Sequence, residues 1–115
     1  MIRVFLVDDQ TLVRQGIRSL LALADGIEVV AEAIDGRQAI ELIPQVKPDV
    51  VLMDMRMPMM SGLEALQALG RAGSLPPTII LTTFDDDALV LAGIKAGAKG
   101  YMLKDVSLEQ LVDAI

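Results

Sequence analysis

The chain has 115 residues, a length that fits one domain and is too short for two. Its hydrophobic content of 53% is too high for an intrinsically disordered chain. The formal net charge of -6 has the wrong sign for a phosphate backbone, so nucleic acid is excluded as a partner of this domain by itself. Cysteine and histidine are absent, which excludes disulfides, Cys/His zinc sites and catalysis by histidine.

The amino terminus has only a short apolar run before Asp8 and Asp9, too short for the apolar region of a signal peptide. Elsewhere no apolar stretch approaches the length of a membrane span. We therefore expect a soluble, cytoplasmic protein with no membrane partner.

Short apolar runs alternate with amphipathic segments along the chain, which predicts strands alternating with helices. The expected strands cover residues 2–7, 27–33, 50–53, 78–81 and 100–103. The expected helices cover residues 12–24, a short segment from 36, residues 62–69, residues 86–96 and a last segment from 107.

Particular residues set the expected helix faces and ends. The first helix is predicted to face the core with a stripe of Leu12, Val13, Gly16, Ile17, Leu20, Leu21 and Ala24. Asp35 is expected to cap the second helix, which Pro44 and Pro48 should limit. The spacing of Ser107 and Gln110 predicts a capping box for the last helix. That helix is still running at Ile115, so we expect it to be truncated.

The alternation of strands and helices predicts an α/β fold with a parallel sheet covered on both faces. Residues 50–53 are apolar on both faces and suit a central strand, whereas Glu28 and Glu32 suit an edge strand. These features favour the flavodoxin-like (βα)5 three-layer sandwich with strand order 2-1-3-4-5, formed by one domain over residues 1–115.

Polar residues follow four of the five expected strands. Parallel strands end at the same edge of a sheet, so these residues are expected to meet there: Asp8, Asp9, Asp54, Thr82 and Lys104. Three carboxylates about 5 Å apart would repel by about 3 kcal/mol per pair at an effective dielectric constant of about 20. Such a cluster must take up a proton or a cation, and its oxygen ligands favour Mg²⁺ or Mn²⁺.

An aspartate beside Mg²⁺ and a lysine can act as a nucleophile toward a phosphoryl group, which points to Asp54. Taken singly, Asp8 or Asp9 could be a helix cap, Thr82 a strand former and Lys104 a solvated side chain. A small Mg²⁺-dependent phosphatase is an alternative, although Asp54-Met55-Arg56 lacks a second carboxylate for acid/base work. A flavin-binding domain is a further alternative, disfavoured by the acidic pair and by an aromatic content of 3%.

The motifs that carry these residues resemble the receiver domains of response regulators in bacterial two-component systems. They are VDDQ (7–10), VVLMDMRMP (50–58), Ser61-Gly62, ILTTFD (80–85) and AGAKGYMLKD (96–105), which together cover nearly the whole chain. The last two motifs resemble those of regulators whose second domain is a helix-turn-helix DNA-binding effector. That effector is absent from this chain.

The resemblance implies that Asp54 accepts a phosphoryl group from a histidine kinase. It also implies that Mg²⁺ is held by Asp8, Asp9, Asp54 and the main-chain carbonyl of Arg56, and that Lys104 binds the phosphate. Thr82 and Tyr101 would form a switch pair that controls the C-terminal effector. The protein would then be no enzyme beyond self-catalysed phosphotransfer and autodephosphorylation; a receiver-like module that is never phosphorylated is the alternative.

Tyr101 and the expected helix at 86–96 have two interpretations each. Without the resemblance, Tyr101 would be read as a half-buried tyrosine with a hydrated hydroxyl. The expected helix at 86–96 is apolar nearly all round, which predicts either a partner or homodimer surface or cover by neighbouring helices. Phe84, two residues after Thr82, is expected to screen water from the phosphoryl group and to lengthen its lifetime.

Overall fold

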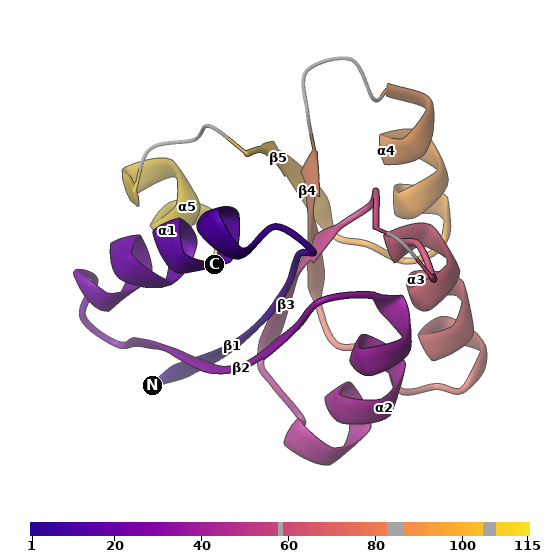
Figure 1. Ribbon diagram of the computed structural model, residues 1–115, viewed down its shortest axis with the longest axis horizontal. Coiled ribbons are helices and arrows are strands. Elements are labelled where there is room, and N and C mark those ends of the chain that lie inside the picture. Colours follow the sequence, from indigo (N-terminus) through magenta and orange to yellow (C-terminus); the bar gives the residue numbers. More distant parts are fainter. Residues whose placement is uncertain (58, 83–86, 105–107) are drawn as a thin grey trace.

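The computed structural model describes residues 1–57, 59–82, 87–104 and 108–115, and within them the chain forms a three-layer α/β sandwich (Figure 1). The strands are β1 (Ile2–Val7), β2 (Ile27–Ala33), β3 (Val50–Asp54), β4 (Thr78–Thr82) and β5 (Gly100–Leu103). The helices are α1 (Thr11–Ala22), α2 (Gly36–Val46), α3 (Gly62–Arg71), α4 (Asp87–Lys95) and α5 (Leu108–Ala114). The predictions on Phe84 and on the Ser107 cap lie outside the described residues.

All neighbouring strands are parallel, in the order β2-β1-β3-β4-β5, which confirms the flavodoxin-like prediction. Figure 1 shows α1 and α5 on one face of the sheet and α2, α3 and α4 on the other. The glutamate-bearing strand β2 lies at an edge, and every residue of β3 is buried. The order follows from right-handed crossovers that keep the most apolar strands inside.

The alternation of side chains along β1 produces two separate cores. Val4 and Leu6 pack with residues of α1 and α5, whereas Phe5 and Val7 pack with residues of α2 and α3. All four side chains are fully buried. A continuous apolar run is therefore required here because both faces of the strand are covered by helices.

The predicted stripe of α1 was too wide. Ile17 and Leu21 are buried and Val13 packs beside them, but Leu12 is 83% exposed. Leu12 and Leu20 lie on a separate row of the helix, spaced by multiples of four residues, and this row faces away from the sheet. A core-facing helix of this length needs only one such row.

The prediction that Pro44 limits the second helix was wrong, whereas the helix does end before Pro48 as predicted. Helix α2 runs through Pro44 to Val46 and ends at Lys47, which has a left-handed backbone with φ 52°. Pro44 removes one backbone hydrogen bond in the last turn. The burial of Ile43 and the packing of Val46 keep that turn helical, and the Asp35 side chain caps the other end as predicted.

Helix α4 keeps part of its apolar surface exposed. Leu91 and Ile94 are exposed, whereas Gly93 is buried against the side chains of Ile80 and Met55. Neighbouring elements therefore cover only one side of α4. None of the helices in the described ranges has the length and apolar character needed to cross a bilayer.

Candidate functional site

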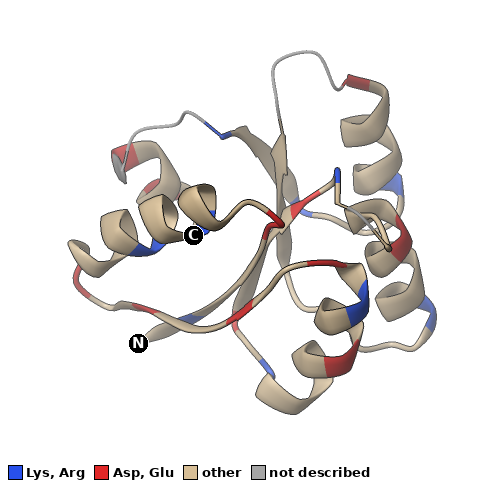
Figure 2. Ribbon diagram, viewed as in Figure 1, with Lys and Arg blue, Asp and Glu red and all other residues tan. Residues whose placement is uncertain are grey.

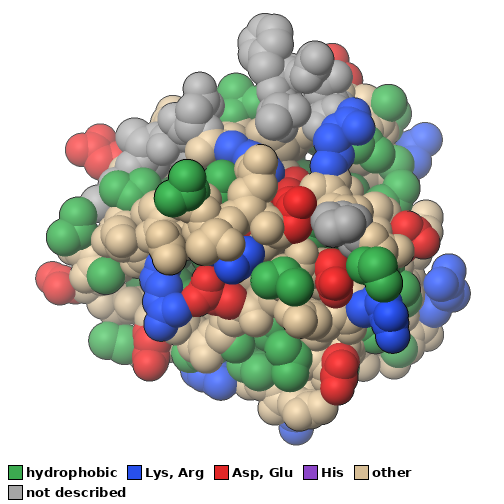
Figure 3. Space-filling view, viewed as in Figure 1, with side chains coloured by type: hydrophobic (Ala, Val, Ile, Leu, Met, Phe, Trp, Pro, Cys, Tyr) green, Lys and Arg blue, Asp and Glu red, His purple; other side chains and the backbone are tan. Residues whose placement is uncertain are grey.

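The carboxyl ends of β1 and β3 bring three aspartates together. Carboxylate oxygens of Asp8, Asp9 and Asp54 all lie within 4.8 Å of one another. Figure 2 shows acidic residues at these two strand ends, and Figure 3 shows acidic side chains near the middle of the same face with basic ones nearby. Asp8 and Asp54 are buried and Asp9 is exposed, so the cluster opens to solvent at one side.

Lys104 reaches this cluster from the end of β5. Its Nζ lies 3.2 Å from Asp8 Oδ2 and 3.1 Å from Asp54 Oδ2. The backbone N–H of Lys104 donates to the carbonyl of Thr82 at 2.9 Å, which keeps the lysine in line with the end of β4. Residues from three strands thus form one site, as the parallel topology predicts.

Each buried aspartate uses one oxygen to shape its own turn. Asp8 Oδ1 accepts a hydrogen bond from the backbone N–H of Gln10 at 2.8 Å, and Asp54 Oδ1 accepts one from that of Arg56 at 3.2 Å. The Oδ2 atoms of both aspartates are buried without an aligned hydrogen-bond donor, although each is in ion-pair range of Lys104. These oxygens retain lone pairs for a further ligand.

Burial and charge shift the protonation of the site. Burial, and then the charge of Asp8, raise the pKa of Asp54 to about 6 from its ordinary 3.8, against the opposing effects of Lys104 and the Arg56 N–H. Burial disfavours the charged form of Lys104, but its close contact with the negative charge of Asp54, and then with that of Asp8, outweighs this effect and raises the pKa of Lys104. One ammonium thus compensates the cluster only in part.

The donors present fit a hard divalent cation. Three carboxylates converge, and two of their oxygens are buried without an aligned donor. Mg²⁺ binds through a few carboxylates and keeps several water ligands, which suits a site with one open side. Beside the cluster lies a hollow of about 440 Å³ lined by Asp9, Met55, Arg56, Met57, Ser61 and Leu89.

Thr82 and Tyr101 lie on adjacent strands. Thr82 is buried at the end of β4, and Tyr101 pairs in register with Ile80, two residues before Thr82. Paired residues and residues two apart point to the same face of a sheet, so both side chains are on the side of α4. Tyr101 is 58% exposed, which is more than the half-buried interpretation expected.

Sequence reasoning missed how Ser61 and Gly62 support the loop that follows β3. Ser61 and Glu64 form a reciprocal capping box at the start of α3, a spacing that the sequence contains. A Cβ at Gly62 would lie 2.1 Å from the backbone oxygen of Asp54 and 2.8 Å from Met55 Cα. Helix α3 therefore begins in direct contact with the backbone of Asp54, and only glycine permits that approach.

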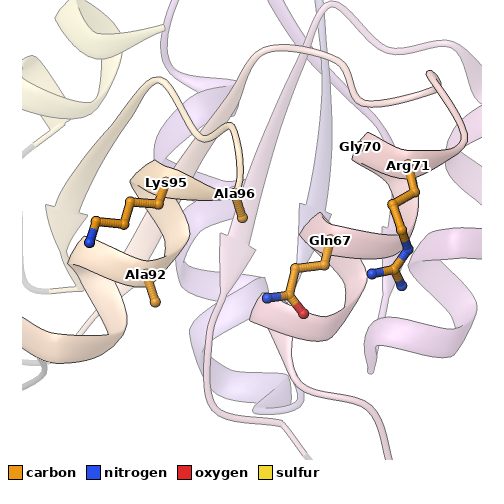
Figure 4. A pocket seen from close by; sticks show the side chains of 6 residues that line it. All are labelled: Gln67, Gly70, Arg71, Ala92, Lys95 and Ala96. Carbon is orange, nitrogen blue, oxygen red and sulfur yellow. The ribbon is translucent and has the colours of Figure 1, made fainter.

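A second hollow of about 670 Å³ lies between the carboxyl-terminal turns of α3 and α4 (Figure 4). It is lined by Gln67, Gly70, Arg71, Ala92, Lys95 and Ala96 and shares no residue with the acidic cluster. Arg71 and Lys95 stand in the last turns of their helices, where cations favour the helix dipole. The chemistry of the predicted site is thus confined to the other end of these helices.

Comparison with known proteins agrees with this geometry. The model of the response regulator receiver domain family matches residues 4–115. The transcriptional regulatory protein YxjL of Bacillus subtilis is 49% identical over 114 residues, covering 99% of this chain and 52% of that protein. The nitrate/nitrite response regulator NarP of Escherichia coli is 50% identical over 113 residues, covering 98% of this chain and 53% of NarP. The chain spans about half the length of these curated relatives.

Solved structures give the same result. The receiver domain of the putative response regulator NarL from Mycobacterium tuberculosis superposes with a TM-score of 0.91 at 36% identity, over 98% of this chain and 91% of that one. The response regulator ChrA of a heme-sensing two-component system superposes with a TM-score of 0.83 at 48% identity, over 98% of this chain and 54% of ChrA. With the sheet order and the acidic cluster, these matches show that the chain belongs to the response regulator receiver domain family.

Proposed function

We propose that this domain is a phosphorylation-activated switch in which Asp54 accepts a phosphoryl group from a histidine kinase. The observation that carries the proposal is the buried Asp54 Oδ2, held 3.1 Å from Lys104 without an aligned hydrogen bond. With a pKa of about 6, Asp54 is largely ionised near neutral pH and can act as a nucleophile. Family membership favours this function over the phosphatase and flavin-binding alternatives.

The reaction forms one bond and breaks one. An Asp54 carboxylate oxygen attacks phosphorus, the bond from phosphorus to the donor histidine nitrogen breaks, and that nitrogen keeps the electron pair and takes a proton. Lys104 is placed to offset negative charge on the phosphoryl oxygens. Asp8, Asp9, Asp54 and the main-chain carbonyl of Arg56 would hold Mg²⁺, which supplies positive charge for the same oxygens. Loss of the group by autodephosphorylation would return the domain to its starting state.

Phosphorylation is proposed to act through Thr82 and Tyr101. A phosphoryl group adds negative charge and acceptor oxygens that the Thr82 hydroxyl can bind. Movement of Thr82 toward the phosphate would leave room for the exposed ring of Tyr101 to turn inward on the same face of the sheet. The surface of β5 and α4 would then differ between the two states.

We propose that the receiver, over residues 1–115, controls a C-terminal DNA-binding effector. This rests on the names of three relatives from Bacillus subtilis that are transcriptional regulatory proteins, of each of which the chain covers about half. A role in transcription would place the protein in the cytoplasm. The exposed Leu91 and Ile94 of α4 would form a contact with a partner or with a second copy of the chain.

The first test is incubation with a small acyl phosphate and Mg²⁺, followed by intact-protein mass measurement. The wild-type chain is expected to gain the mass of one phosphoryl group, and Asp54→Asn none, because the amide is not a nucleophile at this site. Asp25→Asn, at an exposed aspartate, is the matched control and should be modified as wild type. Modification that persists in Asp54→Asn would refute the assignment of the acceptor.

Mg²⁺ is expected to stabilise the folded domain. At ten times its dissociation constant the gain should be about 1.4 kcal/mol, and EDTA should reverse it. The gain should be smaller near pH 5, because the proton on Asp54, whose pKa is about 6, competes with the cation. Thermal unfolding with and without Mg²⁺ at the two pH values measures this; an equal gain at both would contradict it.

A further inference from the structure

Arg14, on the first turn of α1, joins three elements at the edge of the site. Its Nη1 donates a hydrogen bond to the backbone carbonyl of Asp8 at 2.7 Å. Its Nε lies 3.3 Å from Glu32 Oε1 on β2, and its Nη2 lies 3.4 Å from Thr11 Oγ1. The side chain is only 13% exposed, so the guanidinium is enclosed by these partners.

The Asp8 carbonyl that Arg14 binds lies in the sharp turn between β1 and α1. This turn presents both Asp8 and Asp9 to the cluster. The backbone N–H of Asp8 donates to the carbonyl of Ala33 at 3.1 Å, and that of Gln10 donates to Asp8 Oδ1 at 2.8 Å. Arg14 adds the contact to the carbonyl, so the peptide that links the two aspartates is bound directly by its guanidinium.

Glu32 fixes the position of Arg14. It pairs in register with Leu6, two residues before Asp8, so β2 brings a carboxylate level with the turn. One Glu32 oxygen pairs with Arg14 and the other with Arg18. Arg18 differs from Arg14 in two respects: its side chain is 59% exposed, and within the described residues it contacts Glu32 rather than the turn.

We propose that Arg14 is a positioning residue for divalent-cation binding, and that it orients the Asp8–Asp9 peptide without touching the ion. The inference rests on the proposed function, because it assumes that Mg²⁺ binds the three aspartates. Groups that hold metal ligands in place typically contribute 10–100-fold to metal affinity. Arginine suits the role because its planar fork bonds a carbonyl and a carboxylate at once, which a lysine cannot do in the same geometry.

The direction of the change in Mg²⁺ affinity distinguishes a positioning role of Arg14 from an effect of its charge. Removal of a cation near the site would by itself strengthen Mg²⁺ binding, because the cluster would be more negative. Loss of the bond to the Asp8 carbonyl would weaken binding, because the ligands would no longer be preorganised. The exposed position of Arg18 makes it a matched control for the loss of one charge from the same Glu32 cluster.

The experiment compares Arg14→Met with Arg18→Met, since methionine keeps most of the aliphatic stem in both. Mg²⁺ dissociation constants are measured by isothermal titration calorimetry near neutral pH. We expect Arg14→Met to bind Mg²⁺ about 10-fold more weakly and Arg18→Met to stay within about twofold of wild type. Amide exchange of residues 8–10 in the metal-free protein should rise in Arg14→Met and not in Arg18→Met.

Arg14→Lys keeps the charge and decides the question if Arg14→Met does not fold. It should still bind Mg²⁺ several-fold more weakly than wild type. Wild-type affinity in Arg14→Met or Arg14→Lys, or an equal loss in Arg18→Met, would overturn the positioning role and leave the proposed function intact. A wild-type protein that binds no Mg²⁺ but is phosphorylated on Asp54 would overturn the metal assignment and this inference with it.

Discussion

Asp54→Asn is expected to raise the free energy of unfolding of the metal-free protein near neutral pH by about 3 kcal/mol. The folded protein holds the Asp54 carboxylate in a buried place next to Asp8, which raises its pKa to about 6. Ionisation at this position is therefore unfavourable to folding, and asparagine removes the charge at nearly the same volume. Chemical denaturation in the presence of EDTA measures the difference.

The pH dependence of the same measurement gives a second check. Because the folded-state pKa of about 6 lies above the ordinary value of 3.8, the folded protein keeps a proton that the unfolded chain has lost. The contribution of Asp54 to stability is thus full below about pH 4, falls as the pH rises to about 6, and stays low above it. Asp54→Asn should reduce this fall in the free energy of unfolding with pH, and Asp25→Asn, at an exposed position, should not. If Asp54→Asn instead lowered the free energy of unfolding near neutral pH, the expectation that the buried Asp54 charge destabilises the fold would be wrong.

Gly62→Ala is expected to lower the free energy of unfolding by about 3 kcal/mol and to slow phosphorylation of Asp54. The added Cβ would lie 2.1 Å from the backbone oxygen of Asp54, and backbone cannot move aside as a flexible side chain can. The start of α3 or the loop after β3 must therefore shift, and the acceptor shifts with the loop. Urea unfolding and the rate of mass gain with a small acyl phosphate measure the two effects.

Gly16→Ala is the matched control for this substitution. Gly16 is an exposed glycine within α1, and a Cβ there would have no atom within 4 Å. Alanine at this position should stabilise the helix by about 0.5–1 kcal/mol and leave phosphorylation unchanged. Similar effects of the two substitutions would show that the contact with Asp54 is unimportant.

Most of the architecture could be predicted from the sequence, because hydrophobic period and strand-end chemistry are local properties. The apolar run of β3 indicated a central strand, and the glutamates of β2 indicated an edge. The parallel topology then predicted that Asp54 and Lys104 would meet, and Lys104 Nζ lies 3.1 Å from Asp54 Oδ2. The roles given to these residues in phosphoryl transfer remain predictions.

Other features depend on which groups the folded chain brings together. Leu12 has the same apolar side chain as Leu21, and only the packing of α1 on the sheet leaves one exposed and buries the other. In the sequence, Glu32 indicated only that its strand lies at an edge, yet in the structure it binds Arg14 beside the Asp8 turn. No local pattern predicts such a pair, because its partners are 18 residues apart in the chain and lie on different elements.

The sequence alone determined the order of strands and helices and the residues at each strand end, since the periods of hydrophobicity and the residues that stop an apolar run are written along the chain. The tertiary structure decided the raised pKa of Asp54, the close approach of Gly62 to the Asp54 backbone and the contact of Arg14 with Asp8. Burial, steric contact and charge pairing depend on distances through space, which only the packed chain sets.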